Sequence, residues 1–239
     1  MRKLGDAIRD GDATAYGELH YDELWSWCNN LVAAAYLDLV SMELEQYLEL
    51  ESKVAITGRA KVRATVREKL LRRRSEKLPS IQDLAGLRVE ADMTLAEQDA
   101  IVAAICSRFG LLPQAIHDLR DGSHSGYRGV HVWVRLSQPK GAWFEIQVRT
   151  RAQGAWANAY EALADVLGRG IRYGEVPASP IARELVDYLQ RVSLERIAAA
   201  ETLMTESPAQ AAQSRTMVAE ITEGLTVFAK QVRSVRESR

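Results

Sequence analysis

The sequence predicts an α+β fold, in which a β-sheet is flanked by helices and helical extensions lie at both ends of the chain. Two segments, residues 130–136 and 144–150, alternate apolar and polar residues as half-buried strands do. Long stretches before and after them repeat apolar residues every three or four positions, which is typical of helices with one buried face.

The composition is that of a globular protein, with 47% hydrophobic and 26% charged residues in 239. This length accommodates one domain, or one domain with an appended helical segment. The formal net charge of −1 indicates nothing about partners, so only local charge is informative. Cys28 and Cys106 form no metal or redox motif, which favours a reducing cytoplasm. No apolar run approaches a membrane span of roughly 20 residues, and the N-terminus lacks a signal core, so we expect no membrane partner.

Residues 1–50 are expected to be helical. A core-facing stripe there consists of Tyr21, Leu24, Trp25, Cys28, Leu31 and Val32. The next segment, residues 59–74, has eight basic residues against one acid, Glu68. Its ridge of Val62, Val66 and Leu70 predicts a helix that docks while presenting cations. Such a density of cations suits the phosphates of a nucleotide, a nucleic acid or both.

A first strand is expected near Leu87, with Arg88 and Glu90 on its polar face. Thr94 and Glu97 form a capping box, which predicts a helix to about Phe109.

The turn-rich loop 121–126 precedes the strand at 130–136. A turn at Pro139-Lys140-Gly141 would return the chain as the hairpin partner at 144–150.

Helices are expected from residue 150 to 168, from 181 to 204 and from 209 to 235, with a break at Pro208. An apolar stripe follows the last helix, made by Met217, Ile221, Leu225, Phe228, Val232 and Val235. That stripe is too long to stay exposed, so it is expected to pack on the domain, on a second subunit or on a partner.

The polar faces of the three expected strands are rich in groups that bind ligands. They carry Arg88, His131, Glu145, Gln147 and Arg149. This composition favours a binding site over plain exposure to solvent. The sequence has no GxxxxGK[ST] phosphate loop and no GxGxxG, HExxH or GxSxG motif. His117, His124 and His131 lie across a loop and a strand, which favours structural or ligand-contacting roles over a metal site.

Two acids on separate segments, Asp83 and Glu145, can hold Mg²⁺ against a polyphosphate, because that ion prefers hard oxygen ligands. Nearby arginines and lysines can neutralise the charge of a phosphoryl group in transfer. Tyr127, between Gly126 and Gly129, can stack on a base or pack on its own loop.

Five motifs and one lysine occur in the order found in the RelA/SpoT synthetase domain, and the chain resembles that family over about residues 51–175. The matching segments are ITGRAK (56–61), Lys69, DLAGLR (83–88), GYRGVH (126–131), EIQVRT (145–150) and AWA (155–157). The resemblance implies a mixed sheet of the nucleotidyltransferase-like type, with an N-terminal helical segment at 1–50 and C-terminal helices at 176–239.

The resemblance also implies an Mg²⁺-dependent pyrophosphokinase, which moves the β,γ-pyrophosphate of ATP to a ribose 3′ hydroxyl and releases AMP. By similarity, Arg59 and Arg88 contact the adenine or the phosphates, and Lys61 and Lys69 clamp the phosphates. Arg149 occupies a motif position with a supporting contact to the ATP site.

On the metal and acceptor side, Asp83 resembles the Mg²⁺ ligand. Glu145 resembles the glutamate that binds Mg²⁺ or helps to deprotonate the attacking hydroxyl. Tyr127 is similar to the tyrosine that stacks on the acceptor base, and His131 and Gln147 occupy supporting positions.

Two departures affect the acceptor side. Ser125 and Gly129 replace the usual Asn and Ser around the Gly-Tyr-Arg motif. The usual glutamate-histidine pair after Trp-Ala is also missing, since Asn158-Ala159-Tyr160-Glu161 stands there.

Three functions therefore remain open. The first is synthesis of a guanosine alarmone from ATP and GDP or GTP. The second is a toxin that pyrophosphorylates the tRNA 3′ end or makes an adenosine alarmone, held off by an antitoxin. In the tRNA case, Arg72, Arg73 and Arg74 would contact the acceptor stem. The third is an inactive nucleotide- or RNA-binding module. Small members of the family are often tetramers, so a homo-oligomer is also expected.

Overall fold

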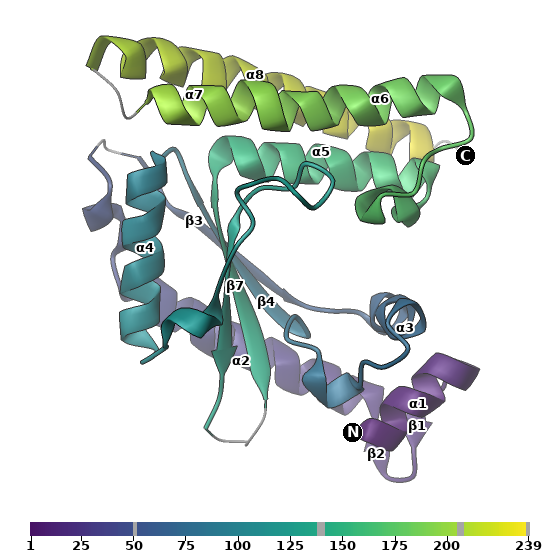
Figure 1. Ribbon diagram of the computed structural model, residues 1–239. Coiled ribbons are helices and arrows are strands. Elements are labelled where there is room, and N and C mark those ends of the chain that lie inside the picture. Colours follow the sequence, from purple (N-terminus) through teal and green to yellow (C-terminus); the bar gives the residue numbers. More distant parts are fainter. Residues whose placement is uncertain (50–51, 138–141, 205–207, 238–239) are drawn as a thin grey trace.

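The computed structural model describes residues 1–49, 52–137, 142–204 and 208–237. Its centre is a mixed sheet of five strands in the order β3-β4-β7-β6-β5 (Figure 1). The strands are β3 (Ala55–Ala60), β4 (Ala85–Ala91), β5 (Ile116–Asp118), β6 (Val130–Arg135) and β7 (Trp143–Thr150). β4 and β7 run parallel, and the other neighbouring pairs are antiparallel. The α+β class and the mixed sheet flanked by helices are confirmed.

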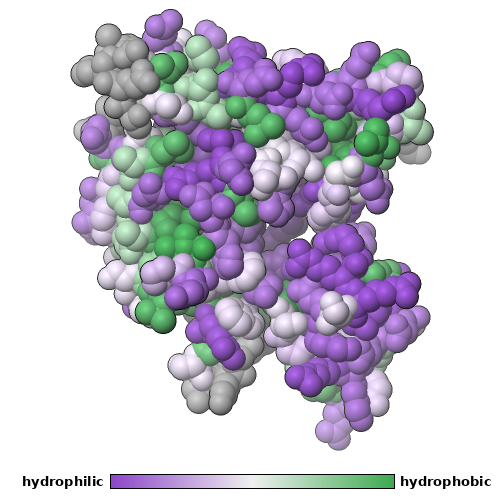
Figure 2. All heavy atoms as spheres, in the orientation of Figure 1, coloured by the Kyte–Doolittle hydropathy of each residue, from purple (hydrophilic) through white to green (hydrophobic). Residues whose placement is uncertain are grey.

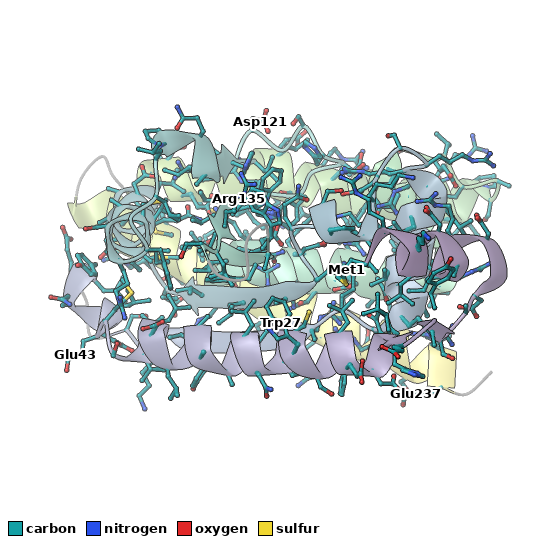
Figure 3. All side chains as sticks on the ribbon, turned by 90° about the horizontal axis from the view of Figure 1, so that it is seen from below. Met1, Trp27, Glu43, Asp121, Arg135 and Glu237 are labelled. Carbon is teal, nitrogen blue, oxygen red and sulfur yellow. The ribbon has the colours of Figure 1, made fainter. Side chains whose placement is uncertain are left out.

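One face of the sheet is apolar because β4, β6 and β7 alternate as expected. Its fully buried side chains include Leu87, Val89, Val132, Ile146 and Val148. Two helices cover this face, α2 (Tyr21–Val40) and α4 (Leu95–Arg108). The capping box is present at the start of α4, where Thr94 Oγ1 accepts from the Glu97 backbone N–H. In Figure 3, α2 extends lengthwise along the sheet.

The N-terminal segment is not purely helical, so that expectation is wrong in part. A small hairpin, β1 (Ala15–Tyr16) with β2 (Leu19–His20), separates α1 (Arg2–Gly11) from α2. Gly17 makes the turn with φ +60, a conformation that glycine adopts easily. Within the expected stripe, Trp25 is 42% exposed rather than buried.

The helix expected at 59–74 begins four residues later. Arg59 lies in β3, which pairs with β4, and α3 (Arg63–Arg72) follows. This edge strand escaped prediction because its residues are largely exposed and show no apolar alternation. Val66 and Leu70 are buried as expected, whereas Val62 is 54% exposed. The short strand β5 was also not expected.

The C-terminal helices form a second core beside the sheet. They are α5 (Arg151–Leu167), α6 (Pro180–Arg191), the π-helical segment η5 (Val192–Ile197), α7 (Ala198–Leu203) and α8 (Pro208–Glu237). α6, η5 and α7 follow one another without a break, and α8 lies against α5 (Figure 1). On α8, Ile221 and Leu225 are buried against α5–α7, whereas Val235 is 50% exposed.

The remaining described elements are short 3₁₀ turns. They are η1 (Leu44–Tyr47), η2 (Leu78–Ser80), η3 (Pro113–Ala115) and η4 (Arg169–Tyr173). The expected turn at Pro139-Lys140-Gly141 lies outside the described residues. Among those described, no helix combines the length and apolar character needed to cross a membrane.

The polar face of the sheet lies between the two apolar cores. The first core joins the apolar face of the sheet to α2 and α4, and the second lies among α5–α8. Side chains on the opposite face of β4, β6 and β7 therefore point toward α5 and α3.

Candidate active site

The polar face of the sheet opens into a cleft bordered by β3, β4, β7, α3 and α5. Two adjoining cavities form it, of about 170 Å³ and about 290 Å³. The residues lining both are Lys61, Asp83, Arg88, Glu145 and Gln147. In Figure 2 the surface is hollowed between a lobe that carries α1 and α3 and a lobe that carries the C-terminal helices.

Asp83 lies between two ammonium groups. Lys61 Nζ, just after β3, is 2.9 Å from Asp83 Oδ2, and Lys69 Nζ, on α3, is 2.9 Å from Oδ1. Burial raises the pKa of the Asp83 carboxyl, but the two lysines outweigh it and lower this pKa to about 2. Asp83 is therefore ionised at neutral pH, with a positive group on each oxygen.

Glu145 accepts three hydrogen bonds from its own sheet. His131 Nδ1 and Trp133 Nε1 approach Oε1 at 2.9 Å and 3.2 Å, and Gln147 Nε2 donates to Oε2 at 2.7 Å. Burial raises the pKa of the Glu145 carboxyl, yet the contacts with His131 and Gln147 bring it below its usual range. These bonds stabilise the ionised carboxylate at neutral pH.

His131 links Glu145 to Tyr127. The Tyr127 hydroxyl is 2.8 Å from His131 Nε2, and the two rings meet edge to face at 5.4 Å. Burial raises the pKa of Tyr127, so its hydroxyl stays protonated and can donate to Nε2 while Nδ1 donates to Glu145. The result is a chain of three side chains, from Tyr127 through His131 to Glu145.

Three guanidinium groups surround Glu161 of α5. Arg59 and Arg88 lie 3.9 Å from its carboxylate oxygens, and Arg172 lies 3.7 Å away. Burial, with Arg149 nearby, lowers the pKa of Arg88. Glu161 stands where the sequence departs from the expected motif, and nothing in its neighbourhood along the chain indicated this contact. Sequence reasoning therefore missed it.

Arg149 reaches the cleft with its guanidinium already paired. It is 2% exposed and makes an ion pair with Glu90, its register partner on β4. Gly154 of α5 makes room for this pair, because a Cβ there would lie 2.6 Å from Glu90 Oε1. Arg149 therefore forms part of the cleft wall, and the Glu90 carboxylate neutralises its charge.

The expected cluster of Arg72, Arg73 and Arg74 divides into two parts. Arg72 lies over the Tyr173 ring at 3.7 Å, and Arg73 Nη1 is 3.8 Å from Glu76. Arg72 and Arg73 line the cleft, and Arg74 does not.

The three histidines form no common cluster, although His117 and His131 are register partners and His124 and His131 line the larger cavity. His117 packs on the Trp133 ring at 3.5 Å, His124 Nδ1 lies 3.2 Å from Ser123 Oγ, and His131 belongs to the chain described above.

Asp83 and Glu145 have the chemistry that Mg²⁺ prefers. Both carboxylates line the same cavity, and both have a lowered pKa. Across the ranges the structure describes, no group of three or more His, Cys, Asp or Glu side chains could hold a metal ion. An ion held by these two acids would need further oxygen ligands from a substrate, as is usual for magnesium at phosphates.

The chain matches the family model described as the region found in RelA/SpoT proteins, over residues 58–165. The protein Rv1366 of Mycobacterium tuberculosis (strain ATCC 25618 / H37Rv) is 42% identical over 208 residues, which are 87% of this chain and 73% of that relative.

Two solved structures have the same fold. A GTP pyrophosphokinase family protein from Streptococcus pneumoniae aligns with a TM-score of 0.59 and 21% identity, over 81% of this chain and 96% of that one. The small alarmone synthetase 1 from Bacillus subtilis, bound to its product pppGpp, aligns with a TM-score of 0.57 and 23% identity, over 83% and 98%.

Proposed function

The chain belongs to the RelA/SpoT family, and we propose that it is a pyrophosphokinase that transfers the β,γ-pyrophosphate of ATP to a ribose 3′ hydroxyl. The observation that carries this proposal is the pair of ionised acids, Asp83 and Glu145, in one cleft with Lys61 and Lys69. Such a cleft suits a polyphosphate and a transfer that depends on charge neutralisation.

On the donor side, Lys61 and Lys69 bind the phosphates of ATP and exchange part of their contact with Asp83 for phosphate oxygens. Asp83 and Glu145 would hold a magnesium ion, whose charge would neutralise the phosphate oxygens of ATP. Arg59 and Arg88 line the smaller cavity and bind the adenine or the phosphates. A planar guanidinium suits both ligands.

In the transfer, the acceptor 3′ oxygen forms a bond to the β phosphorus. The bond from that phosphorus to the α–β bridging oxygen breaks, and AMP leaves with the electron pair. Glu145 accepts the hydroxyl proton as the new bond forms. Its lowered pKa makes it a weak base, so positioning and cations supply most of the rate enhancement.

For the acceptor we favour GDP or GTP, whose base would lie against Tyr127. The half-buried Tyr127 ring lines the larger cavity, and its hydroxyl is held by His131. Gln147 donates to Glu145 and lines both cavities, where its amide oxygen would face the acceptor ribose. The pppGpp product bound to the similar small alarmone synthetase supports a guanine nucleotide.

A second candidate acceptor is the 3′ end of tRNA, in a toxin that an antitoxin neutralises. Exposed cations at the cleft favour it, since the side chains of Arg59 and Arg73 are 72% and 61% exposed. Cations in such positions bind a phosphate backbone without reading sequence.

Parallel incubations with γ-labelled ATP, Mg²⁺ and GDP, GTP, AMP or bulk tRNA test both candidates. We expect label on GDP and GTP, and at least a hundredfold loss in Glu145→Gln, because the carboxylate is needed for the ion and the proton. Glu184→Gln, an exposed glutamate on α6, is the matched control and should keep full activity. Label on tRNA alone would overturn the proposal that the product is an alarmone. Label on no acceptor would overturn the proposal that the protein is a pyrophosphokinase.

The cations that directly follow α3 distinguish the acceptors further. We expect Arg73→Glu with Arg74→Glu to abolish labelling of tRNA through loss of backbone contacts, and to spare labelling of GDP. The measurement is initial transfer rate at two salt concentrations. Equal losses with both acceptors would contradict this assignment.

A further inference from the structure

The loop between β5 and β6 presents Tyr127 to the cleft, and its backbone closes on itself. The Leu119 N–H donates to the Gly129 carbonyl at 2.9 Å, and the Gly126 N–H donates to the Gly122 carbonyl at 2.9 Å. Figure 1 shows this loop rising from the sheet to lie along α5, below the helix that α6 and α7 form. The internal bonds set the shape of the loop, and the contacts with the neighbouring helices set its position, and with it the position of Tyr127.

The π-helical segment η5 holds one side of the loop. Ser193 Oγ donates to the Gly126 carbonyl at 2.6 Å, and Ser193 is 1% exposed. A Cβ on Gly122 would lie 2.2 Å from Leu194 Cδ2, and one on Gly126 would lie 3.1 Å from the Trp156 ring. Both glycines have positive φ, so the loop backbone packs directly on these side chains.

Glu201 of α7 holds the other side through a buried ion pair. Arg128, the residue after Tyr127, places Nη2 2.7 Å from Glu201 Oε2, with side chains 8% and 1% exposed. Thr150 and Gln153 donate to the other carboxylate oxygen at 2.7 Å and 3.0 Å. Removing one partner from such a pair leaves a buried charge without compensation.

The two contacts come from a part of the chain that the motifs do not include. The family match ends at residue 165, whereas η5 and α7 span residues 192–203. A π turn inside a longer helix is rare and is frequent at functional sites. Here it coincides with the residues that touch the loop.

We propose that Glu201, assisted by Ser193, is a positioning residue for the acceptor: it fixes the loop that carries Tyr127. The proposal rests on the proposed function for the role of Tyr127. The C-terminal helices then control binding on the acceptor side of the cleft, because they hold the loop that carries Tyr127. ATP binds mainly to residues of β3, β4 and α3, which are not part of this loop.

The test compares Glu201→Gln with Glu195→Gln, an exposed glutamate in η5. In Glu201→Gln we expect hydrogen exchange of amides 119–129 to rise at least tenfold more than exchange in β4, which reports only unfolding of the whole protein. The acceptor KM should rise at least tenfold and the ATP KM should stay within twofold. Glu195→Gln should match wild type in every measurement.

A milder variant covers the case in which Glu201→Gln does not fold. Ser193→Ala removes one hydrogen bond and should raise loop exchange about fivefold in the same direction.

Three results would overturn the proposal: unchanged exchange at 119–129 in folded variants, exchange that rises equally in β4, or equal increases of both KM values. The exchange measurements need no catalysis, so their failure is distinct from absence of transfer in wild type, which would refute the proposed function.

Discussion

The two acids of the cleft are held in different ways. Asp83 has a lysine ammonium group at each carboxylate oxygen. Glu145 instead accepts hydrogen bonds from Gln147 on its own strand and from His131 and Trp133 on the adjacent strand. Phosphate can compete directly for Lys61 and Lys69. The donors to Glu145 lie on paired strands, so we expect Glu145 to be the more rigid of the two carboxylates.

The stability supplied by Asp83 should depend on pH in one direction. Its folded pKa of about 2 is below the ordinary value of 3.8. A lowered pKa contributes stability above the unfolded pKa, and this contribution is lost as pH falls through the folded pKa. The difference in unfolding free energy between wild type and Asp83→Asn should be constant above about pH 5 and shrink between about pH 4 and pH 2. Urea denaturation at a series of pH values measures it, and a difference that is constant down to pH 2 would contradict the assignment.

The site was predictable from sequence where neighbours along a strand share a face. Arg88, His131, Glu145 and Gln147 were expected together, and they do line one cleft or contact one another. Glu161 and Glu201 were not foreseen. Their partners lie on other elements: Arg128 is 73 residues from Glu201, and Arg59 is farther still from Glu161. Alternation carries no information about such pairs.

At the level of elements, α5 depends on a glycine in its first turn. Gly154 lets the helix approach the Glu90–Arg149 pair on β4 and β7. The close approach joins the second core to the polar face of the sheet, and it explains why a residue with poor helix propensity stands in a buried helical position.

Gly154→Ala should therefore destabilise the protein although alanine favours helices. The helix gains about 1 kcal/mol, but moving the Glu90 carboxylate away from buried Arg149 costs about 3 kcal/mol, the lower end for a broken buried pair because Glu90 is 25% exposed and can shift. We expect a net loss of about 2 kcal/mol in thermal unfolding. Gly224→Ala is the control on α8, where a Cβ would meet no atom within 4 Å, and it should stabilise by about 0.5–1 kcal/mol. Stabilisation by both substitutions would show that the pair tolerates the methyl group.

The elements themselves were predictable to different degrees. Long amphipathic helices and the alternating strands β6 and β7 were found near their observed bounds. The last two residues of the edge strand β3 were expected in a helix, because Arg59 begins the run of basic residues that continues into α3. Only its pairing with β4 distinguishes it.

At the level of the whole molecule, two apolar cores enclose a polar layer. The contacts across that layer include Arg128 with Glu201 and Gln98 with Gln153. The sequence predicts that α8 packs on the domain, a second subunit or a partner, and α8 packs on α5. The sequence does not distinguish these three possibilities, because each of them would bury the same apolar stripe.

These contacts should make the two cores unfold together. Leu225 on α8 is 6% exposed, so Leu225→Ala should cost about 2–5 kcal/mol. If unfolding is cooperative, the same loss appears in the hydrogen exchange of β4 amides, which belong to the other core. Exposed Val227→Ala on the same helix is the control. Protection of β4 that does not change in Leu225→Ala would mean that the bundle opens alone.

The π turn at Val192–Ile197 makes the orientation of α7 depend on the number of residues before it. A π turn is one residue longer than an α-helical turn, and each residue of a helix advances it by about 100°. Deleting a single residue such as Leu194 would restore a regular helix and rotate everything after it by about that angle, which would turn Glu201 away from Arg128. Insertions and deletions here should therefore be tolerated less well than substitutions of exposed residues, because the number of residues, as much as their identity, sets the direction in which α7 faces.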